Sequence, residues 1–233
     1  MNDIKNLQLR WDEEFSSEIN NRLTFADYAN ILFLAYQKAK IKDIAKQYSQ
    51  TVAFLTELLG KTALKGRVIP ASPFGNTVDG LADYRGFPLK EGLYRMEITD
   101  VDFSHSICEW AGSVRDCTVK NSRFVGVNLE GTFFGSAFVE CALDQISLKN
   151  CRLGSSTFLD CTFIGTNLTS AMAGGARFTR CSFKRANIKK AIFLSCTFEE
   201  CNFEETKFHN GSLVGCKFIS GRPSDEQLGN TMV

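Results

Sequence analysis

Residues 176–200 read ARFTRCSFKRANIKKAIFLSCTFEE, and a large apolar side chain recurs at every fifth position of this stretch. The same spacing extends in both directions, and from Leu143 it holds without a fault. Its positions are Leu143, Leu148, Leu153, Phe158, Phe163, Leu168, Ala173, Phe178, Phe183, Ile188, Phe193, Phe198, Phe203, Phe208, Leu213 and Phe218. Neither a helix nor an isolated strand has a period of five, whereas a solenoid does if each pentad forms one side of a coil.

A second series, mostly of small residues, stands two positions before the first. Its members are Cys141, Ile146, Cys151, Ser156, Cys161, Thr166, Ala171, Ala176, Cys181, Ala186, Ala191, Cys196, Cys201, Thr206, Gly211 and Cys216. Two inward residues per pentad, one large and one small, would fill the axis, and the other three would face outward. Four pentads then make a square coil of roughly twenty residues, and stacked coils hydrogen-bond as parallel strands about 4.8 Å apart.

At these positions the chain resembles the pentapeptide-repeat family, whose loose consensus is a small residue, Asp or Asn, Leu or Phe, and two variable residues. The best matches are Val127-Asn128-Leu129, Thr166-Asn167-Leu168, Ala186-Asn187-Ile188 and Cys201-Asn202-Phe203. The resemblance covers about residues 92–220. It implies a mainly β fold, a right-handed quadrilateral β-helix, and the handedness comes from the resemblance rather than from the spacing.

The twenty-residue period also predicts which side chains lie above one another. Two columns form the predicted core ladder: Phe138, Phe158, Phe178, Phe198 and Phe218 in one, and Cys141, Cys161, Cys181 and Cys201 in the other. Stacked cysteines suggest either a metal site or plain buried thiols. Buried thiols are favoured, because the chain has no C-x-x-C pair and parallel thiols have poor disulfide geometry. We therefore expect no metal and no cofactor.

Before Leu143 the spacing has two faults, an extra residue near 109–113 and a missing residue near 129–133. Trp110 stands in the inserted stretch. Its indole either packs over a neighbouring coil at a corner bulge or is exposed as an anchor for a partner, since Trp is frequent at binding hot spots. With both faults counted, the pattern predicts a rod about 30 Å long.

The first sixty residues lack the period of five and predict an α-helical unit over residues 1–60. Apolar residues at helical spacing are Ile4, Leu7, Trp11, Phe15 and Ile19. A capping-box pattern at Thr24 opens a second helix, and a third is predicted over about residues 41–59. No apolar run approaches the length of a membrane span.

The remaining segments complete a four-part division of the chain. Residues 61–91 are rich in Pro and Gly and are predicted to be a connector that wraps over the first coil as a cap. The β-helix follows over residues 92–220, and residues 221–233 are predicted to be a polar, loosely held C-terminal tail. An open edge near Phe218 permits a homodimer through the C-terminal coil.

Charged residues cluster late in the repeats. Opposite charges recur at twenty-residue spacing, so Arg180 is predicted to stack between Asp160 and Glu200. Lys184 and Arg185 stand in the same relation to Glu204 and Glu205. Lys189 and Lys190 have no predicted acidic neighbour. The candidate partner-binding surface is Trp110, Asp160, Arg180, Lys189, Lys190 and Glu200.

No catalytic constellation stands out, and a filled axis leaves no deep pocket, so we expect no enzyme. The function favoured by the sequence is a protein-interaction module that presents a β-helical rod surface. The partner's identity stays open. Nine cysteines without a signal-peptide pattern are typical of a cytoplasmic protein, although a secreted effector is the alternative.

The resemblance implies a second function. Some pentapeptide-repeat proteins modulate or protect a bacterial type II topoisomerase, gyrase or topoisomerase IV, and so confer resistance to a poison or toxin. Those relatives are acidic rods that mimic duplex DNA. Residues 91–220 of this chain contain 14 acidic and 14 basic residues, so a negative rod is not evident. Direct binding of nucleic acid is not expected, because the helix-turn-helix-like stretch at residues 41–50 lacks its turn.

Overall fold

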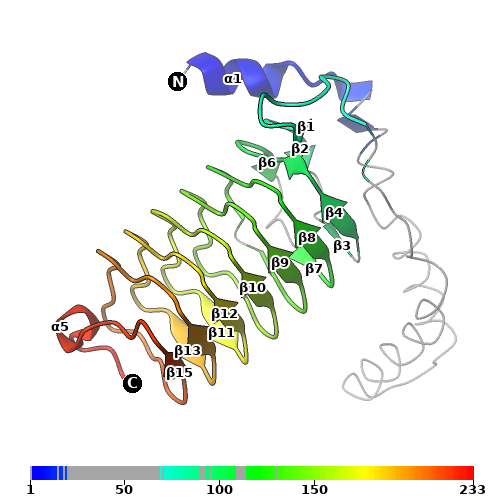
Figure 1. Cartoon of the computed structure of the whole chain (residues 1–233). Coiled ribbons are helices and arrows are strands. Elements are labelled where there is room, and N and C mark those ends of the chain that lie inside the picture. Colours follow the sequence, from blue (N-terminus) through cyan, green and yellow to red (C-terminus); the bar gives the residue numbers. More distant parts are fainter. Residues whose placement is uncertain are drawn as a thin grey trace, which may run out of the picture.

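The computed structural model describes residues 2–14, 16–17, 19, 69, 71–89, 93–94, 96–108, 114–129 and 131–233. The helices predicted over residues 24–40 and 41–59, and Trp110, lie outside these residues. The described chain is a solenoid whose coils stack between helix α1 (Asn2–Leu9) at one end and the short helix α5 (Asp225–Leu228) at the other (Figure 1). The fold is mainly β, with about six turns and little helix.

One side of the solenoid is a seven-stranded parallel sheet with strand order β15-β14-β12-β10-β9-β8-β4. Its strands are β4 (Glu97–Thr99), β8 (Thr118–Lys120), β9 (Ala137–Val139), β10 (Thr157–Leu159), β12 (Arg177–Thr179), β14 (Thr197–Glu199) and β15 (Lys217–Ile219). Each strand contributes one inward and two outward residues. From β9 onward successive strands pair twenty residues apart, as in Phe158 with Phe178.

The other three sides consist of shorter pairings. They contain β1 (Ala82–Asp83) with β5 (Val101–Asp102), β2 (Pro88–Leu89) with β6 (Ile107–Cys108), β3 (Leu93–Tyr94) with β7 (Val114–Arg115), and β11 (Met172–Gly174) with β13 (Ile192–Leu194). Between them run ladders of single parallel bridges at the same spacing, for example Asn167 with Asn187. The coil is therefore four-sided.

Phenylalanine rings fill the axis in two stacks on adjacent sides. Phe138, Phe158, Phe178, Phe198 and Phe218 lie in register, with stacked ring centroids 5.0–5.2 Å apart. A second stack joins Phe163 to Phe183 and Phe203 at 4.9 and 5.3 Å. The two stacks meet edge to face, as between Phe158 and Phe163 at 5.3 Å. Offset-stacked and edge-to-face pairs are the favoured aromatic geometries, so the two columns support each other.

The two faults of the sequence pattern appear as changes of register. Ile98 pairs with Val119, which is one residue more than the repeat. Val119 then pairs with Phe138, which is one residue fewer. The extra residue falls between β6 and β7, so the sheet keeps its inward residues aligned on both sides of the insertion.

The corners of the coil place side-chain-bearing residues in the left-handed region. Successive corners at Glu140, Gln145, Asn150, Ser155 and Asp160 have φ between 53 and 58°. This conformation costs an L-residue about 1–2 kcal/mol. The ladder of backbone hydrogen bonds between coils offsets that cost, since each corner N–H reaches a carbonyl of the next coil, as from Asp160 to Thr179 at 3.0 Å.

The start of the solenoid differs from the prediction. Residues 82–89 do not wrap over the first coil but form two of its sides, because β1 pairs with β5 and β2 with β6. Tyr84 and Leu89 fill inward positions and are buried. The next inward residue, Leu93, follows after four residues, and this short step hides the first coil from a search for a strict period of five.

The end of the first coil is covered by the N-terminal segment. Helix α1 ends at Leu9, so the helical spacing predicted from Ile4 to Ile19 is interrupted, and Trp11 lies on the coil. The indole packs on Tyr84 and Phe87 with centroids 5.6 and 4.9 Å away, and its Nε1 donates to the Arg85 carbonyl at 2.9 Å. The backbone of α1 passes so close to Gly86 that a Cβ there would lie 2.5 Å from the Leu7 oxygen.

A buried ion pair fixes this cap. The carboxylate of Asp83, only 6% exposed, accepts two bonds from Arg10 at 2.6 and 2.9 Å and two from Arg85 at 2.8 and 2.9 Å. Burial opposes the ionisation of Asp83, but the hydrogen bonds from Arg85 and Arg10 outweigh it and hold the pKa of that carboxyl well below its usual value.

The C-terminal segment is ordered rather than loosely held, which corrects the prediction for residues 221–233. A capping box joins Ser224 and Gln227 at the start of α5, and Leu228 is buried. Gln227 Nε2 donates to the Phe203 carbonyl at 2.7 Å, and the Met232 N–H donates to the Gly211 carbonyl at 3.1 Å. The segment therefore pairs with the last coil on one side, and the four-part division of the chain stays a prediction.

The Phe stack yields the first testable prediction. Phe178 is 1% exposed and stacks on both neighbours, so Phe178→Ala is expected to lower the free energy of unfolding by about 3–5 kcal/mol, and Phe178→Asp to abolish the fold. Far-UV circular dichroism during thermal melting measures both. Phe134→Ala, at a ring that is 50% exposed, is the matched control and should change the melting temperature little. An unchanged melting temperature in Phe178→Asp would contradict the register.

The cap yields a pH-dependent prediction. Because the pKa of Asp83 is lower in the folded than in the unfolded chain, its stabilisation is full above about pH 4 and is lost as the pH falls below that. Asp83→Asn should therefore lower stability by about 2 kcal/mol at neutral pH and by progressively less in acid. Urea midpoints of both proteins at several pH values test this. Asp160→Asn, at an exposed pair, is the control, and a difference independent of pH would refute the assignment.

Candidate interaction surface

The small inward side chains form hydrogen bonds from one coil to the next. Cys181 and Cys201 donate from Sγ to the carbonyls of Phe158 and Phe178, each at 3.4 Å, and Thr206 donates to that of Phe183 at 2.7 Å. Ser, Thr and Cys thus make the same bond at equivalent positions. The thiols are protonated donors in this role. Burial raises the pKa of Cys108 and of Cys151 to about 12, which keeps these two thiols protonated at neutral pH.

The cysteine column is free of both disulfides and metal geometry within the described residues. All nine cysteines are free thiols, and no cluster of three metal-ligating side chains occurs there. Cys141, Cys161, Cys181 and Cys201 lie one above another with their sulfur atoms inside the coil. The arrangement offers hydrogen bonds to carbonyls rather than four convergent ligands, so it is a structural column.

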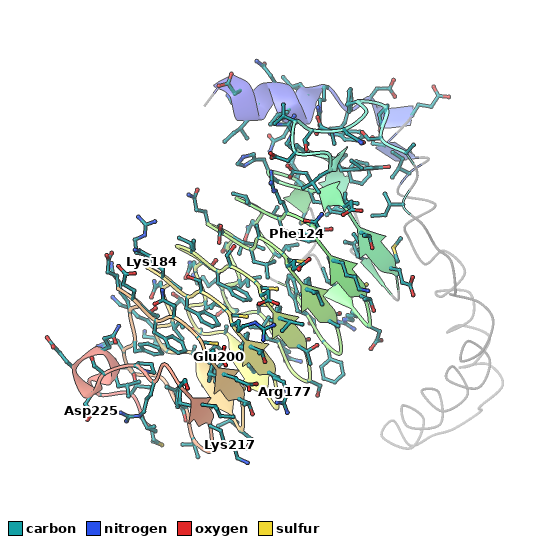
Figure 2. All side chains as sticks on the ribbon, in the orientation of Figure 1. Phe124, Arg177, Lys184, Glu200, Lys217 and Asp225 are labelled. Atoms are coloured by element: carbon teal, nitrogen blue, oxygen red, sulfur yellow. The ribbon has the colours of Figure 1, made fainter. Side chains whose placement is uncertain are left out.

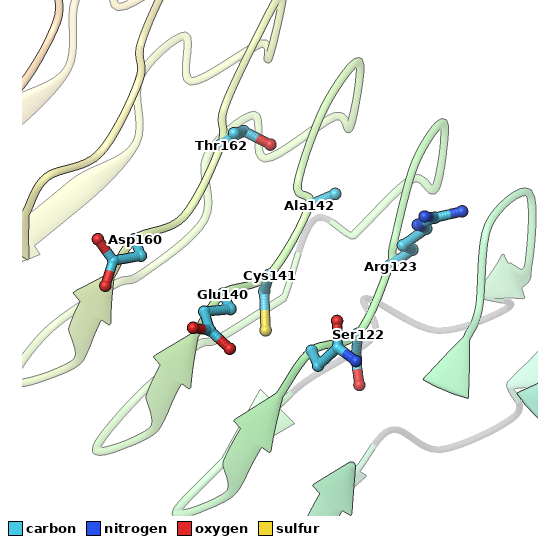
Figure 3. A pocket seen from close by; sticks show the side chains of 8 residues that line it. Ser122, Arg123, Glu140, Cys141, Ala142, Asp160 and Thr162 are labelled. Carbon is cyan, nitrogen blue, oxygen red and sulfur yellow. The ribbon is translucent and has the colours of Figure 1, made fainter. Parts of the chain in front are cut away.

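One shallow hollow lies along the corner after the seven-stranded sheet. It has a volume of about 260 Å³, and Figure 3 shows Asp160 and Glu140 on successive coils, with Cys141 next to Glu140 and with Ser122 and Arg123 on the preceding coil. The polar groups here have partners nearby: Arg123 pairs with Asp79 at 2.6 Å. The hollow is open and brings no nucleophile together with a base, so it suits a surface contact better than chemistry.

The predicted charge ladder is formed in part. Arg180 makes a bidentate ion pair with Asp160, in which its Nε and Nη2 donate to the two carboxylate oxygens at 2.7 and 2.8 Å. This hydrogen bonding lowers the pKa of Asp160. Lys184 pairs with Glu204 at 2.8 Å. Glu200 makes no ion pair with Arg180 among the described residues, although its charge adds to the field that raises the Arg180 pKa.

A further feature of the surface was missed by sequence reasoning. The side that contains β11 and β13 carries a row of apolar side chains, which we call the apolar face. Each is 41–64% exposed, and the members are Phe134, Met172, Ile192, Leu194, Val214 and Met232. The sequence does contain this pattern, because outward positions on this side recur at twenty-residue spacing. The pattern of five considers apolar residues only at inward positions, so it does not reveal the outward ones.

Basic side chains lie along the borders of the apolar face or, in the case of Arg152, in the same column as Met172, and we call them the cationic rim. They are Lys149, Arg152, Arg177, Lys189, Lys190 and Lys217. Lys190 stands at the corner before β13, with φ of 58°, and Arg177 begins β12 just beyond the opposite corner. Figure 2 shows Arg177 and Lys217 on one side of the rod, away from Lys184. None of the six makes an ion pair with a described residue.

The comparisons with known proteins agree with this architecture. A family model described as "Pentapeptide repeat region" matches residues 132–208, so this part of the chain is a pentapeptide repeat region. No curated protein matches the chain. Among the described residues no helix is both long and apolar enough to cross a membrane.

Three solved structures illustrate the distance to known relatives. A pentapeptide repeat protein from the thylakoid lumen of Arabidopsis thaliana is 21% identical, with a TM-score of 0.33, and the match covers 42% of this chain and 65% of that one. QnrB1, a plasmid-mediated fluoroquinolone resistance protein, is 14% identical over 65% of this chain and 76% of that one, with a TM-score of 0.27. Rfr23 from the cyanobacterium Cyanothece 51142 is 16% identical over 66% and 92%, with a TM-score of 0.20. At these scores the likenesses carry no argument about function.

The thiols give the third testable prediction. Buried thiols with a raised pKa react slowly, so an excess of a disulfide reagent at mildly alkaline pH should label the folded protein slowly and all nine cysteines rapidly in denaturant. The half-buried Cys216 should react first, because its hydrogen bond with Cys196 lowers its pKa. A chelator should leave the melting temperature unchanged. Fast labelling of Cys161 or Cys181, or destabilisation by the chelator, would contradict the structural role of the column.

Proposed function

We propose that this protein is a non-enzymatic interaction module that presents the surface of its β-helical rod to a protein partner. The observation that carries the proposal is the filled axis. The largest inward side chains are fully buried from Tyr84 to Phe198, and backbone hydrogen bonds join each coil to the next. A packed axis leaves the outward positions as the place where function can reside, and these differ from side to side in polarity and charge.

The rod suits partner binding in a second respect. Interfaces between proteins form at low cost in conformational entropy when one surface is rigid beforehand. Here the outward side chains stand on a backbone that is hydrogen-bonded to a coil on each side. The free thiols support a reducing compartment, and we place the protein in the cytoplasm on that ground.

Homodimerisation through the last coil stays part of the proposal. Strand β15 is the outer strand of the seven-stranded sheet, and the segment after it pairs with a different side, at Ser212 and Met232. An edge strand of this kind can pair with a second copy. Sedimentation velocity over a range of concentrations measures this directly.

The experiment that tests the proposed function is a binding selection with the full chain as bait. Fragments of the source genome are displayed on phage and selected on the immobilised protein, and binding is then measured in solution. We expect a small set of in-frame fragments that bind the folded protein with micromolar affinity or better and do not bind Phe178→Asp. Failure to enrich any such fragment, together with turnover of a metabolite in a substrate screen, would overturn the proposal in favour of an enzyme.

Topoisomerase modulation is the alternative, and a gyrase assay separates it from the main proposal. A DNA-like rod needs a continuous negative surface, whereas six cations without a paired carboxylate line one side of this rod. We therefore expect micromolar protein neither to inhibit supercoiling nor to relieve cleavage stabilised by a quinolone. Inhibition or relief by native but not heat-denatured protein would put the alternative first.

A further inference from the structure

The apolar face is a flat, exposed surface on the most regular part of the rod. Met172, Ile192, Leu194 and Val214 are 41–45% exposed and lie on three successive coils. Met172 pairs with Ile192 and Gly174 with Leu194, so the side chains stand in two columns on a hydrogen-bonded backbone. Scattered single apolar residues on a surface need no explanation, but a contiguous patch marks an interaction site.

A notch interrupts the face. In the column that runs from Phe134 to Val214, two positions are glycines, Gly154 and Gly174. The Phe134 ring covers Gly154, at 3.4 Å from where a Cβ would stand. A Cβ on Gly174 would meet nothing within 4 Å, and the same holds for Gly175 at the next corner. Gly174 therefore leaves a gap, the notch, in the column of outward side chains between Phe134 and Leu194.

Charge on this side is of one sign. The four stretches 149–157, 169–177, 189–197 and 209–217 make up the apolar face and its borders over four coils. They contain all six cations of the rim and no Asp or Glu, whereas the whole chain has a net charge of only +1. Glu130, which precedes these stretches in the sequence, lies outside the described residues. The acidic residues of these coils are consequently confined to the other sides.

We propose that the apolar face and its cationic rim form a docking site for an acidic amphipathic peptide segment of a partner protein. This inference rests on the proposed function and specifies the surface and the partner's chemistry. Five coils, from Phe134 to Val214, span about 19 Å, which is the length of an α-helix of about 13 residues. Such a segment would place one apolar side chain in the notch at Gly174 and carboxylates along both edges, opposite Lys189 and Arg177.

The charge pattern favours this occupant over three others. A second copy of the same face would bring six cations against six cations, and like charges in an interface are unfavourable. A nucleic acid would set its phosphates over a centre of Leu, Ile and Met side chains that cannot pair with them. A lipid surface has no protruding group to fill the notch.

The test is a selection of random peptides of about 16 residues, displayed on phage and captured on the immobilised full chain. Enriched peptides should combine regularly spaced apolar residues with a net negative charge, and their binding should weaken as salt increases. Synthetic versions of the best peptides are then titrated against wild-type and variant proteins by fluorescence anisotropy.

Paired variants separate the face from the rest of the rod. Lys190→Glu combined with Arg177→Glu should weaken binding by at least about tenfold, while Lys120→Glu on the seven-stranded sheet should change it less than about twofold. Leu194→Ser should weaken binding as well. Its control is Ile107→Ser, at a residue of similar exposure, 40% against 45%, on another side. All variants replace exposed residues, and unchanged melting temperatures verify that each is folded.

Each alternative occupant has its own readout in the same set of proteins. Pelleting with phosphatidylserine vesicles, binding to duplex DNA, or dimerisation in sedimentation that is lost in Leu194→Ser would each overturn the peptide assignment. Enrichment of neutral or basic peptides, or of none, would also overturn it. If genome-encoded fragments bind the rod but ignore the Lys190 and Arg177 changes, only this inference fails. If no fragment binds any side, the proposed function fails as well.

Discussion

The parallel backbone ladder between coils is the interaction on which the rest of this structure depends. Neighbouring residues on a side bond alternately to the coil before and the coil after. The Asn167 N–H donates to the Ile146 carbonyl at 3.0 Å, and the Leu168 N–H donates to the Asn187 carbonyl at 2.8 Å. The ladder fixes the spacing between coils at about 4.8 Å. That distance is close to the separation preferred by stacked aromatic rings, so the Phe columns and the ladder reinforce the same geometry. A corner such as Glu140 keeps its unfavourable φ because the bonds on both sides of it hold the turn.

The same constraint decides which outward residues become neighbours. Once the period is twenty, residues such as Met172 and Ile192 must lie one above the other, whatever lies between them in the chain. Opposite charges in one column therefore form pairs without any design of the local sequence, as Asp160 and Arg180 do. Apolar residues in one column likewise build a continuous face, and the basic residues of the next columns become its border.

Much of the fold could be predicted from the sequence because the period is long and nearly perfect. The inward columns, the register and the two faults all follow from the spacing of large and small residues. The ends could not be predicted in this way. Trp11 caps the first coil through contacts with residues more than seventy positions away, and the tail bonds back to Phe203 and Gly211. Contacts of this kind occur once and leave no repeat in the sequence.

The candidate surface shows a different limit of sequence reasoning. Lys189 and Lys190 were identified because the residues twenty positions before and after each of them are not acidic, and that argument needs only the period. Predicting the apolar face requires one further step, the assignment of the inward positions. Until they are assigned, an outward Ile or Leu cannot be distinguished from a core residue. When the buried columns are subtracted, the residues left over on each side carry the functional information. A solenoid with a filled axis and a uniform backbone can differ from its relatives only in those columns, so the uneven distribution of charge and apolar area among the four sides is the feature of this chain that a partner can read.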